Sequence, residues 1–331
     1  MFYFFFFFLF LTSNLSAQQY YFRNFTAQNG LGSASVNHIF QDSKGYIWFA
    51  NQLGGISKFD GRNFITLTTA NGLINNDATY ITEDKLGNIW IGTASGVSMF
   101  NGSTFKNFSS KEGITDETVY CIYVDDNNTK WFATNGDGVI AMDKSGEVKR
   151  LTTQEGLKHN TIFSITKDSI GSLWFSHKKW FAKYEAGSIK DFTPANDPDA
   201  ERIFFTSFTD AKGKVWLGST DGDVIVYDAQ NLFRKFELPA PFNTSFISSI
   251  TQDKRGNMWF ATSSGVLKYN GKDFKVFNER NGLASNAAQT ILCDNENNIW
   301  LGTLSGGVNL ISSEAFRYFT DTEGLLNTNI S

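Results

Sequence analysis

DKLGNIWIGT, residues 84–93, is the stretch that decides the fold, because its pattern returns seven times along the 331-residue chain. Each copy carries a tryptophan, and successive tryptophans are 41 to 43 residues apart: Trp48, Trp90, Trp131, Trp174, Trp216, Trp259 and Trp300. Six residues before each tryptophan stands an aspartate: Asp42, Asp84, Asp125, Asp168, Asp210, Asp253 and Asp294. Seven such pairs in register indicate an internal repeat and not a chance match.

The spacing within the repeat predicts strands joined by tight turns. Asp-x-x-Gly, as at Asp84 to Gly87, is typical of a type I turn whose last residue is left-handed; glycine is unstrained there, and Asn128 and Asn297 are tolerated substitutes. A hairpin signal follows the third expected strand, as at Asn101-Gly102. Four short strands per repeat, seven times over, are typical of propeller blades. We therefore predict an all-β fold, a seven-bladed β-propeller of four-stranded antiparallel blades, over residues 18–331.

The composition fits this fold and excludes one class of partner. Aromatic residues make up 16% of the chain, and 29 glycines stand against 4 prolines, which favours short aromatic-rich strands with glycine turns. A formal net charge of −4 leaves no basic surplus to neutralise phosphates, so we expect no nucleic-acid partner. Cys121 and Cys293 occupy different positions in different repeats. Two buried thiols are therefore favoured over a disulfide, which an oxidising compartment would permit.

The N-terminus predicts export. Phe2 to Leu11 is an unbroken apolar run of ten residues. As a helix it would reach roughly 15 Å, against about 30 Å for a hydrocarbon core, so it fits the apolar region of a signal peptide, residues 1–17, that ends at Ala17. No Lys or Arg precedes the run, so an uncleaved lipid anchor or a buried N-terminal segment remains an alternative. Export predicts a periplasmic or secreted protein whose mature chain makes no membrane contact.

The two ends of the repeat array bear on how the ring closes. Phe22-Arg23-Asn24-Phe25 has the pattern of a fourth strand but precedes the first blade, so it can complete the last blade and join the chain ends. Phe316 to Phe319 then repeats that pattern, and residues 315–331 have the pattern of a partial further repeat. Either the closure overlaps or the chain is the N-terminal piece of a longer protein, and we favour the second.

The combined pattern resembles the two-component regulator propeller repeat. Its clearest copy is Asn71-Gly72-Leu73, Asp84, Gly87, Ile89-Trp90-Ile91-Gly92-Thr93 and Gly96-Val97, and the resemblance covers residues 20–325. In that family such repeats form the extracytoplasmic sensor half of hybrid histidine kinases, many of which respond to oligosaccharides. The resemblance implies ligand sensing, with phosphotransfer left to further domains of a longer sensor chain.

Departures from the repeat are the best candidates for a site. In the fourth copy, Ser176 to Trp180 replaces a glycine-containing loop, and Trp180 is the only tryptophan outside the ladder. Before the fifth and sixth copies the usual connection gives way to residues 194–202 and 239–243. Loops between second and third strands open on the same face as the connections between blades, so these departures should cluster on adjacent blades.

An exposed tryptophan with charged neighbours suits an oligosaccharide or an anion, and the alternatives are a protein interface or drift of loops without function. The candidate ligand-binding residues are His177, Lys178, Lys179, Trp180, Asp197, Asp199, Arg202, Phe242 and Asn243.

No catalytic constellation accompanies these residues. His38, His159 and His177 lack metal-ligand spacing and an adjacent nucleophile, and the aspartate turns lack the ligand spacing of a calcium loop. The ladder tryptophans are expected to pack between sheets. We therefore expect no metal, no cofactor and no catalytic residue. The leading interpretation is an extracytoplasmic ligand-sensing propeller; the alternative is a stand-alone secreted protein-interaction scaffold, followed by a propeller lyase with a histidine and an acid at the channel mouth.

Overall fold

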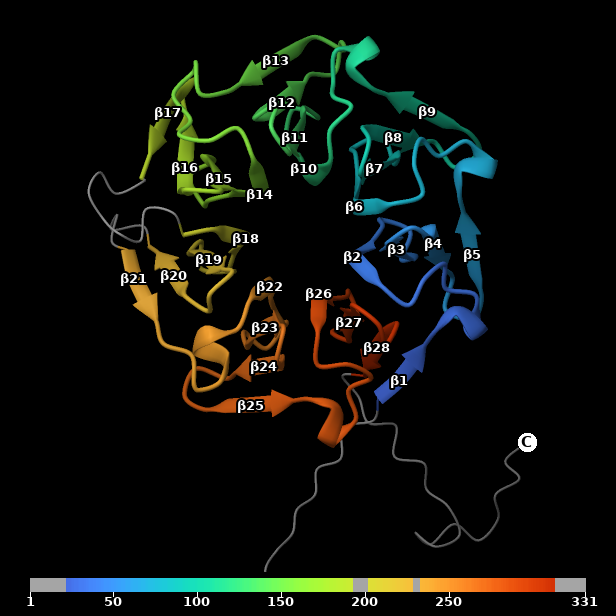
Figure 1. Ribbon diagram of the computed structural model, residues 1–331, viewed down its shortest axis with the longest axis vertical. Coiled ribbons are helices and arrows are strands. Elements are labelled where there is room, and N and C mark those ends of the chain that lie inside the picture. Colours follow the sequence, from blue (N-terminus) through green and yellow to red (C-terminus); the bar gives the residue numbers. More distant parts are fainter. Residues whose placement is uncertain (1–21, 193–201, 229–232, 313–331) are drawn as a thin grey trace, which may run out of the picture.

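The computed structural model describes residues 22–192, 202–228 and 233–312, which form a ring of seven four-stranded sheets (Figure 1). All neighbouring strands pair antiparallel. The predicted seven-bladed β-propeller is confirmed. Blade 1 consists of β2 to β5, blades 2 to 6 follow in chain order with four strands each, and blade 7 consists of β26 to β28 with β1.

The strands take four positions from the centre of the ring to its rim. Innermost are β2 (Val36–Gln41), β6 (Ala78–Glu83), β10 (Val119–Val124), β14 (Ile162–Lys167), β18 (Phe204–Thr209), β22 (Ile247–Gln252) and β26 (Ala288–Cys293). Second are β3 (Ile47–Asn51), β7 (Ile89–Thr93), β11 (Lys130–Thr134), β15 (Leu173–His177), β19 (Val215–Ser219), β23 (Met258–Thr262) and β27 (Ile299–Thr303).

Third are β4 (Gly55–Phe59), β8 (Val97–Phe100), β12 (Val139–Met142), β16 (Trp180–Glu185), β20 (Val224–Tyr227), β24 (Gly265–Tyr269) and β28 (Val308–Ile311). Outermost are β5 (Phe64–Leu67), β9 (Phe105–Phe108), β13 (Val148–Leu151), β17 (Ser188–Asp191), β21 (Phe233–Phe236), β25 (Phe274–Phe277) and β1 (Phe22–Phe25). Single 3₁₀ turns in the connections between blades are Ala27–Asn29, Thr69–Asn71, Ser110–Glu112, Phe242–Thr244 and Glu279–Asn281.

The ring is closed by a strand from the N-terminal side of the array. β1 pairs antiparallel with β28, with Phe22 opposite Ile311 and Phe25 opposite Val308, so blue and red segments lie side by side in Figure 1. Phe25 is buried and its ring stacks on Trp300 at 5.8 Å. The prediction that residues 22–25 complete the last blade is confirmed. The expected signal peptide, residues 1–17, and the partial repeat, residues 315–331, lie outside the described residues.

An aspartate–tryptophan hydrogen bond recurs in every blade. The indole Nε1 of the ladder tryptophan donates to Oδ2 of the aspartate six residues earlier, at 2.8 to 3.0 Å. The other carboxylate oxygen accepts backbone N–H groups of the turn, as Asp84 does from Leu86 and Asn88. All seven tryptophans are buried, as predicted. The repeat spacing therefore encodes one unit, because a single carboxylate holds both the turn and the tryptophan between sheets.

The two cysteines are free thiols, as predicted. Cys121 is buried and Cys293 is half-buried. Burial raises the pKa of the Cys121 thiol to about 11, so this sulfur is protonated at neutral pH.

Candidate channel-mouth site

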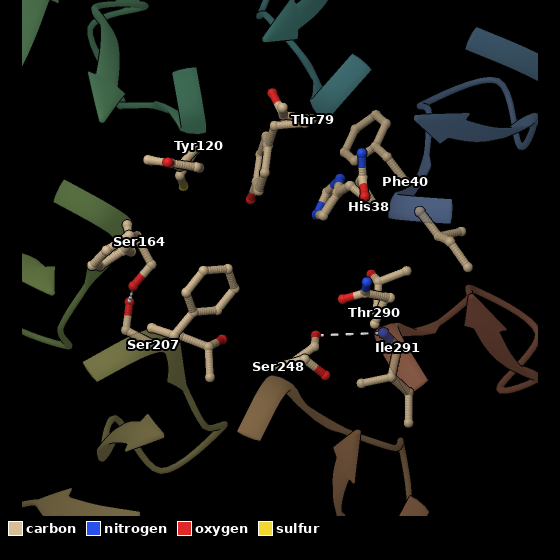
Figure 2. Close-up of a pocket in the computed structure, with 18 of the residues that line it drawn as sticks. His38, Phe40, Thr79, Tyr120, Ser164, Ser207, Ser248, Thr290 and Ile291 are labelled. Carbon is tan, nitrogen blue, oxygen red and sulfur yellow. Dashed lines mark hydrogen bonds between the residues drawn. The ribbon is translucent and has the colours of Figure 1, made fainter. Parts of the chain in front are cut away.

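The ring encloses a central cavity of about 600 Å³ that is lined by the inner strands of all seven blades (Figure 2). Figure 2 shows Thr79, Tyr120 and Ser248, from three different inner strands, around the open centre. The volume lies within the usual range for a small-molecule pocket.

A β-bulge at the second residue of every inner strand aims a side chain at this cavity. The register of each inner strand against its neighbour shifts across that residue in all seven blades. A bulge inserts one residue and redirects its side chain. We call these seven residues the bulge ring: Asn37, Thr79, Tyr120, Phe163, Phe205, Ser248 and Gln289, all of which line the cavity.

The bulge ring lies at the mouth of the channel. Each bulge is near the start of its strand, next to residues that connect the blades, such as Asp77 and Thr118. Loop residues between second and third strands, Gln52 and Ala94, line the same cavity. The cavity thus reaches the face that carries both kinds of loop, which we call the loop face.

On four consecutive blades the mouth is polar, and three of these residues bond to the next blade. Asn37 Nδ2 donates to the Ala78 carbonyl at 2.8 Å, Thr79 Oγ1 to that of Val119 at 2.5 Å, and Ser248 Oγ to that of Ala288 at 2.7 Å. The side chain of Gln289 has no hydrogen-bond partner among the described residues. We call Ser248, Gln289, Asn37 and Thr79 the polar arc.

On blades 3, 4 and 5 the mouth is aromatic, with Tyr120, Phe163 and Phe205 at the bulge. Phe246, which precedes β22 of blade 6 and is not among the residues that line the cavity, extends this row of rings. Their ring centroids are 5.3 Å apart from Tyr120 to Phe163, 5.3 Å from Phe163 to Phe205 and 4.9 Å from Phe205 to Phe246. All four side chains are only half-buried. We call these four residues the aromatic arc.

The cavity wall is nearly free of charge. Among the described residues that line it, Asp77 is the only acidic side chain and His38 is the only basic one. Desolvation lowers the pKa of His38 to about 3. The backbone N–H of Ile81 donates to Nδ1 at 3.3 Å, a hydrogen bond that the neutral ring accepts. The imidazole stacks on Tyr80 with ring centroids 3.8 Å apart. His38 is therefore neutral at physiological pH, and the wall presents hydroxyls, amides and rings.

Trp180, the tryptophan outside the ladder, occupies a glycine position. It pairs with His177 at the end of the β15–β16 hairpin, where β4 and β24 begin with Gly55 and Gly265. Its φ is 94°, in the left-handed region. The side chain is half-buried, with centroid distances of 5.6 Å to both Phe181 and Phe204. The expectation of an exposed tryptophan therefore holds only in part, because one side of the ring packs on these neighbours.

His177 is also less accessible than expected. Its side chain is 0% exposed, and Nε2 lies 2.9 Å from Asp191 Oδ2. Its Nδ1 accepts from the backbone N–H of Lys179 at 3.1 Å. The buried His177 side chain therefore holds the backbone of the loop at Lys179. The expectation that it forms part of an exposed platform was wrong. Lys178 is exposed and Lys179 is half-buried.

The departures from the repeat do come together on the loop face of blades 4 to 6. The backbone N–H of Trp180 donates to the Arg202 carbonyl at 3.2 Å. The Arg202 guanidinium pairs with Asp221 at 3.2 Å and with Asp223 at 2.5 Å, in the β19–β20 loop. The backbone of Asn243 lies directly against Gly222, the glycine between these two acids. A Cβ added at Gly222 would lie 2.4 Å from the Asn243 carbonyl carbon, so no larger residue fits there. Asp197 and Asp199 lie outside the described residues.

Phe242 belongs to the core and not to the surface of this cluster. It is 3% exposed and packs with Leu238 and Ile247 in the core of blades 5 and 6. It stands five residues before its inner strand, as the buried leucines Leu31, Leu73, Leu157 and Leu283 do in other blades. Its proposed ligand contact was wrong, because the proline-rich connection replaces the usual leucine with a phenylalanine in the same core position. Asn243 is exposed.

The bulge ring was not predicted from the sequence. No single residue type is common to its seven positions, so no repeat signal marks the position. One signal was present: Tyr120, Phe163 and Phe205 are 43 and 42 residues apart, at the same place in three consecutive copies.

The remaining histidines and acids show no metal site. His159 Nδ1 accepts from the Thr161 backbone N–H at 2.8 Å. Among the described residues, no group of three or more His, Cys, Asp or Glu side chains is placed to hold a metal ion. In the same part of the chain, no helix is both long and apolar enough to cross a bilayer.

Comparison with known proteins first finds the same fold in extracellular domains of one and two component systems and in a lyase. The extracellular domain of a hybrid two component system from B. thetaiotaomicron superposes with a TM-score of 0.76 at 24% identity, covering 89% of this chain and 42% of that one. The extracellular domain of a one component system from the same organism superposes with a TM-score of 0.75 at 22% identity, covering 88% of this chain and 40% of that one. Virginiamycin B lyase from Staphylococcus aureus superposes with a TM-score of 0.69 at 17% identity, covering 88% of this chain and 98% of the lyase.

Four segments of the chain match a known repeat family. Residues 30–52, 72–95, 241–264 and 282–305 match the two component regulator propeller family, so these four segments carry repeats of this type. The chain spans about two fifths of the two extracellular domains above. No curated protein matched the sequence.

Proposed function

We propose that this chain is a non-catalytic, extracytoplasmic ligand-sensing module that belongs to a longer two-component receptor and binds an oligosaccharide on its loop face. Support comes from the repeat family and from the similarity of the fold to extracellular domains of two-component systems. Further support comes from the gathering of irregular loops on adjacent blades of one face.

The observation that carries the proposal is Trp180 in place of glycine. In five other blades the equivalent residue is a glycine with positive φ: Gly55, Gly96, Gly138, Gly265 and Gly307. A left-handed conformation costs a residue with a side chain about 1–2 kcal/mol. Such strain persists where the side chain has a use that glycine cannot supply. An indole beside exposed Lys178 and the Arg202–Asp221 pair gives a stacking surface with hydrogen-bonding groups at its edge.

Thermal unfolding with a panel of neutral and acidic oligosaccharides tests this function. We expect at least one oligosaccharide to raise the Tm of the wild type. Trp180→Gly should abolish that rise while changing the free energy of unfolding by less than about 1 kcal/mol, because relief of backbone strain offsets the lost ring contacts. Trp180→Phe, which keeps an aromatic ring, is the matched control and should retain most of the rise. The proposal fails if no oligosaccharide stabilises the wild type, or if Trp180→Gly responds like the wild type.

A further inference from the structure

The central channel contains the second feature that points to a ligand. A propeller channel needs side chains to fill its mouth, and the simplest way is that of blades 1, 2 and 6. There a short polar residue bonds to the carbonyl of the next blade; Ser248 is 6% exposed, and Asn37 and Thr79 are half-buried. Each such bond stabilises the ring by about 1 kcal/mol.

Blades 3, 4 and 5 lack this bond. Tyr120, Phe163 and Phe205 have no polar atom that reaches the next blade's carbonyl, and neighbouring rings contact each other in tilted pairs instead. Half-buried aromatic rings on three consecutive blades leave apolar surface facing the water in the channel. Apolar surface that is held exposed in a concave site is typical of a binding site.

The opposite wall supplies polar groups. The Gln289 amide has no partner among the described residues, and it lies in the polar arc across the same cavity. In the aromatic arc, the Tyr120 hydroxyl also has no partner among the described residues, and its pKa is raised by desolvation and by the Glu117 charge, so that it remains a donor. A ligand in this mouth would therefore meet rings on one side and hydrogen-bonding groups on the other.

The near absence of charge restricts the ligand class. With Asp77 as the one acid in the wall and His38 neutral, a negatively charged ligand group that enters the cavity loses its hydration and gains no ion pair. A pyranose or furanose ring is neutral, has C–H groups on its faces and has hydroxyls around its rim. That chemistry matches the aromatic arc and the polar arc, and Asp77 can accept a hydrogen bond from a hydroxyl.

We infer that the channel mouth binds one neutral sugar ring, which stacks on the aromatic arc and bonds through its hydroxyls to Tyr120 and Gln289. This inference rests on the proposed function and adds a ligand class and a second place on the loop face. Trp180 then contacts a more distant part of an oligosaccharide whose end lies in the channel.

Short glycosides separate the two places. Neutral methyl hexosides and pentosides fit the channel but do not extend over the loops, and their binding is measured by ligand-observed NMR titration. We expect Phe163→Ser to weaken this binding about tenfold or more, since an aromatic contact contributes on that scale. Phe105→Ser, which removes a half-buried ring from the outer strand β9, is the matched control and should bind like the wild type. Trp180→Gly should also leave it unchanged. Methyl uronosides, their negatively charged counterparts, should bind at least tenfold more weakly.

The outcomes are distinct. If Phe163→Ser leaves the affinity for neutral glycosides unchanged, or if uronosides bind as tightly, the channel inference is wrong. If oligosaccharides stabilise the protein but no neutral glycoside binds to the wild type, the channel inference is again wrong while the proposed function stands. Failure of the proposed function itself would appear in the oligosaccharide experiment, with no stabilisation by any member of the panel.

Discussion

Blades 1, 2 and 6 present the same β-bulge to the channel as blades 3, 4 and 5, but the side chain at the bulge has a different role. In the first group it is short and polar and bonds to the neighbouring blade. In the second it is aromatic and leaves that bond unmade. The backbone of the repeat is therefore indifferent to the residue at this point. The polar residue adds a hydrogen bond between blades that the aromatic residue lacks, and the aromatic residues on three consecutive blades are the feature from which the channel site is inferred.

Ser248→Phe should lower the free energy of unfolding most, because it places an aromatic residue at the bulge of a blade whose native residue bonds to the next blade. The substitution removes hydrogen bonds to the Ala261 and Ala288 carbonyls, at 3.0 and 2.7 Å, and places a large ring where the side chain is 6% exposed. We expect a loss of about 2–3 kcal/mol in the free energy of unfolding, measured by urea denaturation. Ser248→Ala, which removes only the hydrogen bonds, should lose about 1 kcal/mol. Equal stability of Ser248→Phe and the wild type would contradict the distinction between the two groups of blades.

Acid should destabilise the fold through His38 in blade 1, one of the blades with the polar bulge residue, and the loss should be smaller than that of Ser248→Phe. The folded state lowers the pKa of His38 from 6.5 to about 3, so the unfolded chain binds more protons between these values. The stabilisation by neutral His38 is complete above the unfolded pKa and is lost as the pH falls through this window. Between pH 7 and pH 5 we expect a loss of about 1–2 kcal/mol.

The matched variant for this effect is His38→Gln, which does not titrate and keeps an oxygen that can accept the Ile81 N–H. Its stability should change less between pH 7 and pH 5 than that of the wild type. An identical pH dependence in the two proteins would show that other groups are responsible.

Phe205→Ser should have the smallest effect on stability. It gives blade 5 the serine that blade 6 uses, so a new bond to the Ile247 carbonyl can offset the lost contacts with Phe163 and Phe246. We expect the free energy of unfolding to change by less than about 1 kcal/mol in urea denaturation. A loss of 3 kcal/mol or more, the usual cost of truncating a core phenylalanine, would mean that the aromatic arc is part of the core.

The sequence predicted the scaffold well because the scaffold is repeated. The aspartate–tryptophan spacing gave seven blades, and the displaced Phe22–Phe25 pattern gave the closing strand. The hydrogen bond that joins Asp84 to Trp90 was not foreseen, since spacing alone does not show which side chains meet across a turn.

The site was predicted only in part. Irregular loops predicted that the departures from the repeat lie together on adjacent blades, but they did not show that Trp180 is half-buried, that His177 is fully buried or that Phe242 replaces a core leucine. Trp180 stands six residues after Trp174, as Gly96 does after Trp90, so a strict alignment of the repeats would have shown that it occupies a glycine position. The channel mouth depends on a bulge, and a bulge has no fixed residue type by which to find it.

The closing strand has a mechanical consequence. Phe22 and Ile311 face each other at the same end of the β1–β28 pair, so the two ends of the ring leave it side by side. Tension applied through both ends would act on one hydrogen-bonded pair at a time and unzip β1 from its outer end, whereas a parallel arrangement would load all the pairs together in shear. Blade 7 thus holds the two ends of the ring together, and it is the blade that would open first under a pulling force.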